Sequence, residues 1–182
     1  SSAAPTVRRV AGGDRVGTAI AASQDRFAQA GSARAVIVAR SDASQFADAL
    51  SDVPLAAADK APLLLTPRDR LRPDVGAEID RVAARGATVY VLGGTAAIKP
   101  GVADSLSQRG LRVVRLGGND RYETATIIAS EGLHHPRRLF EASGIDFPDA
   151  LAAGTAAAAR GGAVLLTAGA VQSRATARYL RA

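Results

Sequence analysis

The sequence predicts an α/β fold in which a parallel β-sheet is covered by helices on both faces. Short runs of β-branched and other apolar residues alternate at regular intervals with alanine-rich segments of helical pattern. The apolar runs are nearly continuous, which is typical of strands buried on both faces. The loops between the segments are short, and strand–helix–strand alternation with short loops is typical of parallel sheets.

The individual elements follow in order along the chain. Strands are expected at residues 34–39, 61–66, 87–92, 111–116, 137–142 and 163–167, with a short further strand at Val7–Val10. Helices are expected at residues 16–28, 46–59, 72–84, 96–108, 121–130, 147–160 and 172–180. We also expect the strand that follows each Asp-Arg helix, 34–39 or 137–142, to be buried on both faces.

The chain contains an internal repeat. The segment "VAGGDRVGTA" at residues 10–19 returns as "LGGNDRYETA" at residues 116–125. In the same order, "FADAL" returns as "FPDAL" and "APLLLT" returns as "GAVLLT", both 101 residues later. The sequence therefore predicts a tandem repeat, with a first module at residues 1–111 and a second, incomplete module at residues 112–182. The second module lacks a counterpart of "VYVLGG" at residues 89–94.

The repeated motif places glycines between a strand and a helix, with Asp and Arg in the first helical turn. Asp14 and Asp120 are expected to cap helix N-termini, where a carboxylate accepts hydrogen bonds from backbone N–H groups. Arg15 and Arg121 either hold an anionic ligand or have a structural role, in which they pair with an internal carboxylate or lie over a strand end. The internal pair is favoured because both copies carry the arginine. The residues expected to have structural roles in the repeat are Gly13, Asp14, Thr18, Gly93, Gly94, Gly118, Asp120 and Thr124.

Four aspartates near strand ends are candidates for a polar cleft, because ligands of doubly wound sheets bind at the carboxyl ends of the strands. They are Asp42, Asp48, Asp146 and Asp149. The alternative is that they cap helices, and no second carboxylate stands at a fixed spacing that would indicate an acid–base pair.

The sequence indicates neither a catalytic centre nor a metal or cofactor site. It has no cysteine, no G-x-S-x-G and no H-E-x-x-H, and its two histidines, His134 and His135, are neighbours in an expected exposed loop. The glycine turns do not match G-x-G-x-x-G, so dinucleotide binding is not indicated. No apolar run approaches the length of a membrane-spanning helix, which is about 20 residues.

The chain is basic, with a net charge of +6, and all but two of its 23 basic residues are arginines. A positive balance favours an anionic partner. A GC-rich genome also favours arginine over lysine, which leaves the sign of the charge as the informative observation.

The segments "VVRLGGNDRYETA", "FPDAL", "APLLLT" and "VYVLGGTAAI" together resemble the cell-wall-binding repeat type 2 family of Gram-positive bacteria. The resemblance implies Rossmann-like or flavodoxin-like modules, in tandem and in contact with one another, on secreted proteins of the cell wall or cell surface. Such modules are non-catalytic anchors, and some bind anionic wall polymers. The implied partners are an anionic wall polymer or a peptidoglycan-associated glycan and other copies of the module, without membrane or nucleic acid. The expected ligand-binding residues are Arg15, Arg121, Tyr122, Asp48 and Asp149.

The chain departs from the family pattern at several positions. Val16 and Gly17 stand where Tyr and Glu are usual, so a tyrosine contact is expected only in the second copy. The family usually has three copies, whereas fewer than two are present here. Two other functions remain open: an α/β enzyme domain that binds a nucleotide or sugar phosphate, and a protein-interaction regulator of an exported enzyme.

Overall fold

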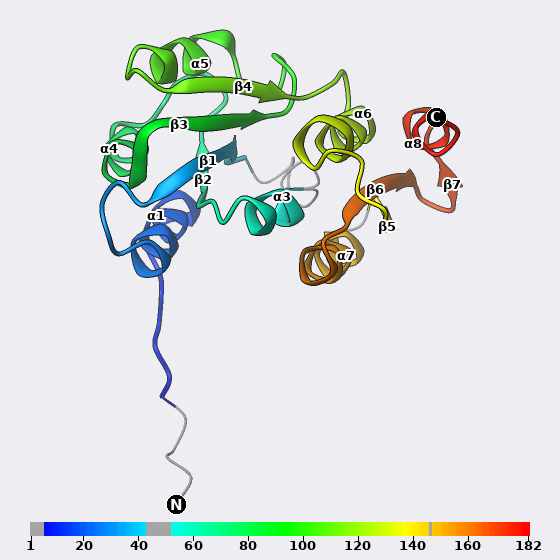
Figure 1. The fold of residues 1–182 in the computed structure, drawn as a ribbon, viewed down its shortest axis with the longest axis horizontal. Coiled ribbons are helices and arrows are strands. Elements are labelled where there is room, and N and C mark those ends of the chain that lie inside the picture. The colour runs from blue at the N-terminus through cyan, green and yellow to red at the C-terminus, as the bar shows by residue number, and fades with distance from the viewer. Residues whose placement is uncertain (1–5, 43–51, 146) are drawn as a thin grey trace, which may run out of the picture.

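Two β-sheets organise the chain in a computed structural model that describes residues 6–42, 52–145 and 147–182 (Figure 1). The first sheet is parallel, in the order β2-β1-β3-β4. In the second sheet, of order β5-β6-β7, β5 and β6 are parallel and β7 is antiparallel to β6. The strands are β1 (Ala33–Arg40), β2 (Leu63–Thr66), β3 (Ala83–Leu92), β4 (Arg112–Leu116), β5 (Leu139–Ser143), β6 (Ala163–Ala168) and β7 (Val171–Gln172).

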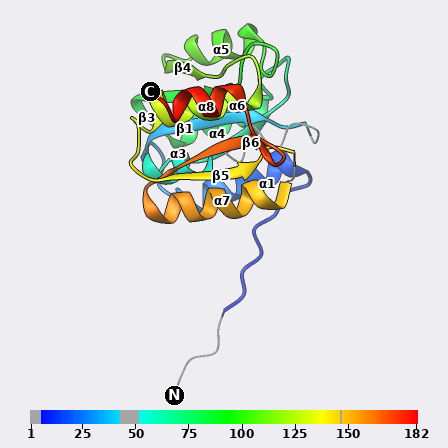
Figure 2. The same ribbon diagram turned by 90° about the vertical axis from the view of Figure 1, so that its right-hand side faces the viewer.

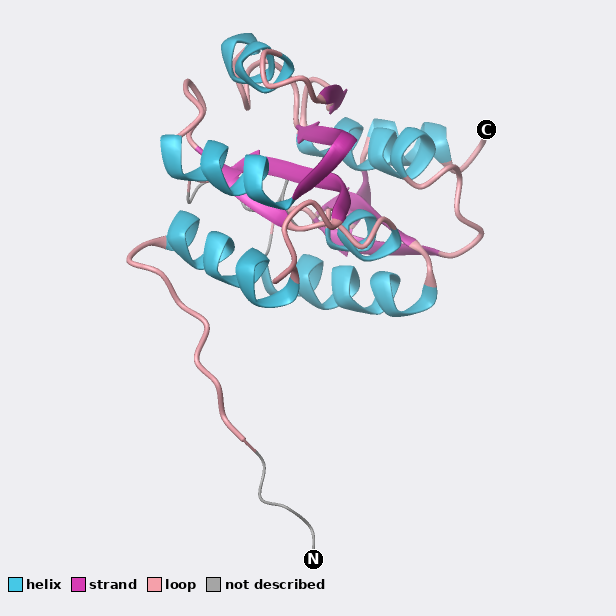
Figure 3. Cartoon of the chain, turned by 60° about the vertical axis from the view of Figure 1, so that its left-hand side comes forward, coloured by secondary structure: helices cyan, strands magenta, loops and turns pink. Residues whose placement is uncertain are grey.

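Helices lie between the strands in sequence and on either side of them in space (Figure 3). A single π-helical turn, η2, continues α6. The helices are α1 (Arg15–Arg26), α3 (Val53–Ala58), α4 (Pro73–Val82), α5 (Pro100–Ser107), α6 (Arg121–Ile127), η2 (Ile128–Gly132), α7 (Phe147–Arg160) and α8 (Arg174–Tyr179).

The first sheet is covered on both faces, as predicted. Val36 and Val38 of β1 belong to a core that includes residues of α1, α4 and α5. Ile37 lies on the opposite face, with Leu55 of α3 and Ile128 of η2. Because successive strand residues point to opposite faces, the continuous apolar run of β1 supplies both cores.

A buried carboxylate joins α1 to α4 in the first of these cores. Glu78 is 3% exposed and accepts hydrogen bonds from Ser23 (2.5 Å) and from Arg81, whose Nη2 and Nε lie 2.7 and 2.8 Å from its oxygens. Burial alone would raise the pKa of Glu78, but the hydrogen bonds from Arg81, Ser23 and Gln24 outweigh it and lower that pKa. Glu78 is therefore charged and paired in the folded protein.

In the second sheet, α7 packs against β5 and β6, whereas α6 and α8 pack against β6 (Figure 2). Ala150 and Ala157 of α7 are buried against Val164 and Leu166 of β6. On the other face of β6, Leu165 packs with Ala129 of η2. Helix α3 packs against α7 and so links the two sheets. None of the described helices combines the length and apolar composition needed to cross a membrane.

Two expectations about strands are wrong. The segment Val7–Val10 is not a strand: residues 6–12, here called the N-terminal arm, have no regular structure and leave the body of the molecule (Figure 1), with Val7 94% exposed. It has no strand beside it to supply hydrogen-bond partners. In β5 only Ala142 is buried, because β5 lies at the edge of its sheet whereas β1 lies between β2 and β3. The helix expected at residues 172–180 is present as α8, which begins two residues later because Gln172 belongs to β7.

Candidate functional site

The repeated motif has the same local structure in its two copies. Asp14 accepts a hydrogen bond from the N–H of Gly17 (2.7 Å) at the start of α1, and Asp120 accepts one from the N–H of Glu123 (2.8 Å) at the start of α6. Both predicted N-caps are therefore confirmed.

The threonine of each motif holds the glycine turn that precedes the helix. The hydroxyl of Thr18 accepts from the N–H of Gly12, and the hydroxyl of Thr124 accepts from the N–H of Gly118, both at 3.1 Å. The six-residue spacing is the same in each copy, so one threonine per copy fixes the loop onto its own helix.

The arginine of each motif reaches the end of the following strand. Arg15 Nη1 donates to the carbonyl of Ser41 (3.0 Å), just after β1, and Arg121 Nη1 donates to the carbonyl of Gly144 (2.7 Å), just after β5. The contact that the two copies share is thus with a backbone carbonyl at a strand end, which is one of the structural alternatives considered from the sequence. A guanidinium satisfies a strand-end carbonyl that the sheet leaves without a partner.

The first copy carries an additional ion pair. Arg72, the residue before α4, bridges Asp14 (2.6 Å) and Asp74 (2.5 Å). The hydrogen bond from Gly17 and the contact with Arg72 lower the pKa of Asp14. In the second copy the residue before α8 is Ser173, which caps that helix by accepting from the N–H of Thr176 (3.0 Å).

The glycine pair after β3 packs directly on the glycine pair after β4. A Cβ added to Gly117 would lie 2.0 Å from the carbonyl carbon of Gly93, and one added to Gly94 would lie 2.4 Å from the carbonyl oxygen of Gly118. Arg115 Nη1 donates to the carbonyls of Gly93 (2.8 Å) and Gly94 (3.3 Å), and burial lowers the pKa of this guanidinium. The glycines are therefore required by the contact of two backbones, and a bound phosphate is not needed to explain them.

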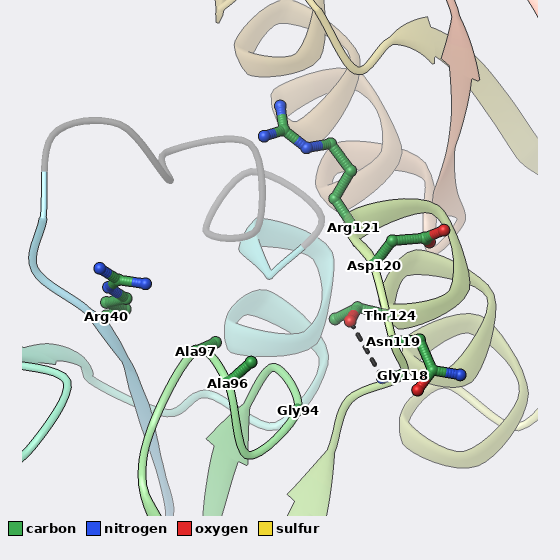
Figure 4. A pocket seen from close by; sticks show the side chains of 9 residues that line it. All are labelled: Arg40, Gly94, Ala96, Ala97, Gly118, Asn119, Asp120, Arg121 and Thr124. Carbon is green, nitrogen blue, oxygen red and sulfur yellow. Dashed lines mark hydrogen bonds between the residues drawn. The ribbon is translucent and has the colours of Figure 1, made fainter.

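A cavity of about 250 Å³ opens beside this contact (Figure 4). Its wall consists of backbone and small side chains from Gly94, Ala96, Ala97 and Gly118, and two arginines, Arg40 and Arg121, extend from different elements at its margin (Figure 4). Arg40 is already paired with Asp42 (2.7 Å). The remaining lining residues are Asn119, Asp120 and Thr124.

The other residues predicted from the sequence are dispersed. Tyr122 is half-buried, with its ring close to Gly144. Asp149 is exposed in the first turn of α7. Asp48 and Asp146 lie outside the described residues, so the cleft expected from the four aspartates stays a prediction. Around Gly13 no heavy atom lies within 4 Å of an added Cβ.

Arg40, Arg72 and Arg115 were not predicted to take part. The only signal in the sequence was a charged residue within or next to an apolar run, which does not reveal its partner. Within the described ranges, no group of three or more His, Asp or Glu is placed to hold a metal ion. His134 and His135 are exposed. The ring of His135 stacks on the ring of Tyr179, and the two ring centroids are 5.7 Å apart.

Comparisons with known proteins agree with one another. The sequence profile of the family described as Cell wall binding domain 2 (CWB2) matches residues 9–103 and 115–181. N-acetylmuramoyl-L-alanine amidase LytC of Bacillus subtilis (strain 168) is 35% identical over 124 residues, which are 68% of this chain and 24% of that protein.

Two solved structures have a similar fold. Cwp8 from Clostridium difficile superposes with a TM-score of 0.84 at 31% identity, over 94% of this chain and 29% of that chain. Cwp6 from Clostridium difficile superposes with a TM-score of 0.81 at 24% identity, over 94% of this chain and 26% of that chain. The chain thus spans between a quarter and a third of the length of these proteins.

Proposed function

Because the chain belongs to the cell wall binding domain 2 family, we propose that it is a secreted, non-catalytic module that holds a protein on an anionic polymer of the cell wall. The observation that carries the proposal is the match of the family over both motif copies. The similarity to Cwp8 over 94% of this chain supports it. The relative LytC is named as an amidase, and this chain matches 24% of its length.

The anionic nature of the polymer is proposed from charge. The chain has 23 basic and 17 acidic residues. Several of the acidic side chains are used internally: Asp14 and Asp120 cap helices, and Glu78 is paired with Arg81. An excess of guanidinium groups attracts polymers that carry phosphate or carboxylate, in a manner that salt screens.

We further propose that residues 1–111 and 112–182 are two repeat modules that associate with further copies. The N-terminal arm lies as far before Asp14 as β4 lies before Asp120. Unlike β4, the arm pairs with no strand among the described residues. The outer edge of β5 is unpaired among the described residues, whereas β1 has β3 at the corresponding edge. Exposed strand edges favour association. Light scattering would test this: a mass of one chain at all concentrations contradicts it.

Ligand contacts by Arg15, Arg121, Tyr122, Asp48 and Asp149 are the alternative that the Arg121→Ala substitution tests against a purely structural role. Arg121 lines the cavity beside the glycine contact, and its position at a helix start next to a neighbouring strand end favours it among the five.

The proposal is tested by co-sedimentation of the chain with purified wall sacculi, before and after extraction of their anionic polymers. We expect the chain to sediment with intact sacculi and to remain in solution with extracted sacculi. Equal recovery with both preparations contradicts polymer binding, and recovery with neither contradicts wall binding altogether. Calorimetry with nucleotides and sugar phosphates is a parallel control, since micromolar affinity for one of them would favour an enzyme domain instead.

A further inference from the structure

Helix α8 carries a row of arginines on the surface of the second sheet. Arg174 and Arg178 are one turn apart and exposed, and Arg181 follows in the next turn, where its N–H donates to the carbonyl of Arg178 (3.1 Å). Residues spaced by three or four positions share one side of a helix. No Asp or Glu follows Asp149 in the sequence, so this part of the chain is uniformly basic.

The arginines line hollows on both flanks of α8. One, of about 580 Å³, lies between α8 and the start of α6 and includes Tyr122, Arg174 and Arg178. A second, of about 490 Å³, is lined by Arg174, Arg178 and Arg181, and a third, of about 300 Å³, again includes Arg178. Arg178 is common to all three. The hollows therefore form an extended surface, which suits a polymer better than a small compact ligand.

The first module does not have this surface. The offset of 101 residues that relates β2 to β6 also relates α4 to α8. At the positions that correspond to Arg174, Arg178 and Arg181, the first module has Pro73, Ala77 and Asp80. In the first module, the starts of α1 and α4 are joined by the ion pair of Asp14 with Arg72. The arginines of α8 are therefore not required by the repeat architecture.

The α6 side of the first hollow presents groups suited to sugar hydroxyls. Asp120 and Glu123 line it, and each uses one oxygen to accept from backbone N–H groups, those of Glu123 and Asn119 respectively. Carboxylates accept hydrogen bonds from hydroxyl groups, and they repel a plain polyanion. Tyr122, on the same wall, adds an aromatic side chain. A ligand that has both hydroxyls and negative charges matches the two walls together.

We propose that the cleft between α6 and α8 binds an acidic glycan, whose phosphate or carboxylate groups are held by Arg174 and Arg178 and whose hydroxyls contact Asp120 and Glu123. The inference rests on the proposed function and locates the polymer-binding surface within the second module. It assigns the binding to arginines outside the repeated motif.

The test compares the double variant Arg174→Ala/Arg178→Ala with a control, Arg34→Ala/Arg85→Ala, which removes the same charge from exposed positions on β1 and β3. Binding is measured to intact sacculi by co-sedimentation and to oligogalacturonate by calorimetry, with neutral dextran and polyphosphate as further probes. Thermal melts of both variants establish that they are folded, which is expected because all four side chains are exposed.

The cleft variant is expected to bind sacculi about tenfold more weakly, as befits the loss of charge-assisted contacts, and the control within about twofold of wild type. Dextran is expected not to bind, and polyphosphate to bind more weakly than an acidic glycan at equal charge. If the chain binds sacculi through these arginines but does not bind oligogalacturonate, the anionic group that the site recognises is phosphate. If it binds both sacculi and oligogalacturonate, the site also accepts carboxylates.

Equal losses in the cleft variant and the control would overturn the inference. If oligogalacturonate binds, polyphosphate binding as tight as that of oligogalacturonate at equal charge would overturn it as well. Wild-type binding to sacculi that the cleft variant retains would overturn it too, while leaving the proposed function intact. If wild type binds neither sacculi nor oligogalacturonate, the proposed function fails together with the cleft.

Discussion

Replacing Gly117 by alanine tests the contact between the two glycine loops. The added Cβ would lie 2.0 Å from the carbonyl carbon of Gly93 and 2.4 Å from the nitrogen of Gly94. Both neighbours are backbone atoms, so no side chain can rotate out of the way. Carbon atoms prefer separations of about 3.5 Å or more, and the loops would have to separate by roughly 1.5 Å.

That separation would break two hydrogen bonds. The N–H of Gly93 donates to the carbonyl of Leu116 (2.9 Å), and Arg115 donates to the carbonyl of Gly93 (2.8 Å). A neutral hydrogen bond contributes about 1 kcal/mol and one to a charged group about 1.5–3 kcal/mol. The expected loss in the free energy of unfolding is therefore about 2.5–4 kcal/mol, or about 5–16 °C in the melting temperature for a chain of this size.

Gly13→Ala is the matched control, because nothing lies within 4 Å of its added Cβ. The first copy already has Ala11 at the position that corresponds to Gly117. Thermal and urea unfolding of the two variants are compared with wild type, and the control is expected within about 0.5 kcal/mol. A Gly117→Ala melting temperature within about 1 °C of wild type would refute the glycine contact.

Further substitutions test three other features of the structure. Asp120→Ala and Asp14→Ala are each expected to cost about 1 kcal/mol through the lost cap, and urea unfolding curves that overlay wild type at both positions would remove that account. Arg81→Ala is expected to cost about 2–3 kcal/mol because it leaves the buried Glu78 carboxylate without its cation. Since the folded-state pKa of Glu78 is lowered, the stabilisation from its ion pair is present above its ordinary pKa of 4.5 and disappears as pH falls below that value. Glu78→Gln should flatten this part of the pH–stability profile. An unchanged profile speaks against the pair. Arg121→Ala is expected to cost about 1–2 kcal/mol through the lost contact with a strand-end carbonyl, with wall binding reduced only as folding is; unaltered melting together with lost binding would show that Arg121 binds ligand.

The fold class was predictable because strands buried on both faces have continuous apolar sequences. Ile37 and Val38 supply opposite cores, and the six longer strands were found within a few residues of their expected bounds. The incomplete burial of β5 follows from its place at the sheet edge, although Glu141 already distinguished its sequence from the continuous apolar run of β1. The structure of Val7–Val10 was not predictable, because its composition suits a strand but it has no neighbouring strand.

The motif was predictable to the extent that its interactions are local. Asp14 and Asp120 act three residues away, within a turn of helix, where sequence spacing determines geometry. Arg121 contacts a carbonyl 23 residues away. Such a partner depends on how helix and sheet pack, which the sequence pattern does not specify. For this reason the sequence did not decide between an internal carboxylate and a strand end as the partner of the arginine.

Binding of this chain to the cell wall through an anionic polymer can be measured as an isotherm on intact sacculi at low and at physiological salt. We expect saturable binding whose affinity decreases as salt screens the arginines, and no saturable binding to sacculi stripped of their anionic polymers. Binding that is unchanged by both salt and extraction, or the absence of saturable binding to intact sacculi, would contradict binding through an anionic polymer.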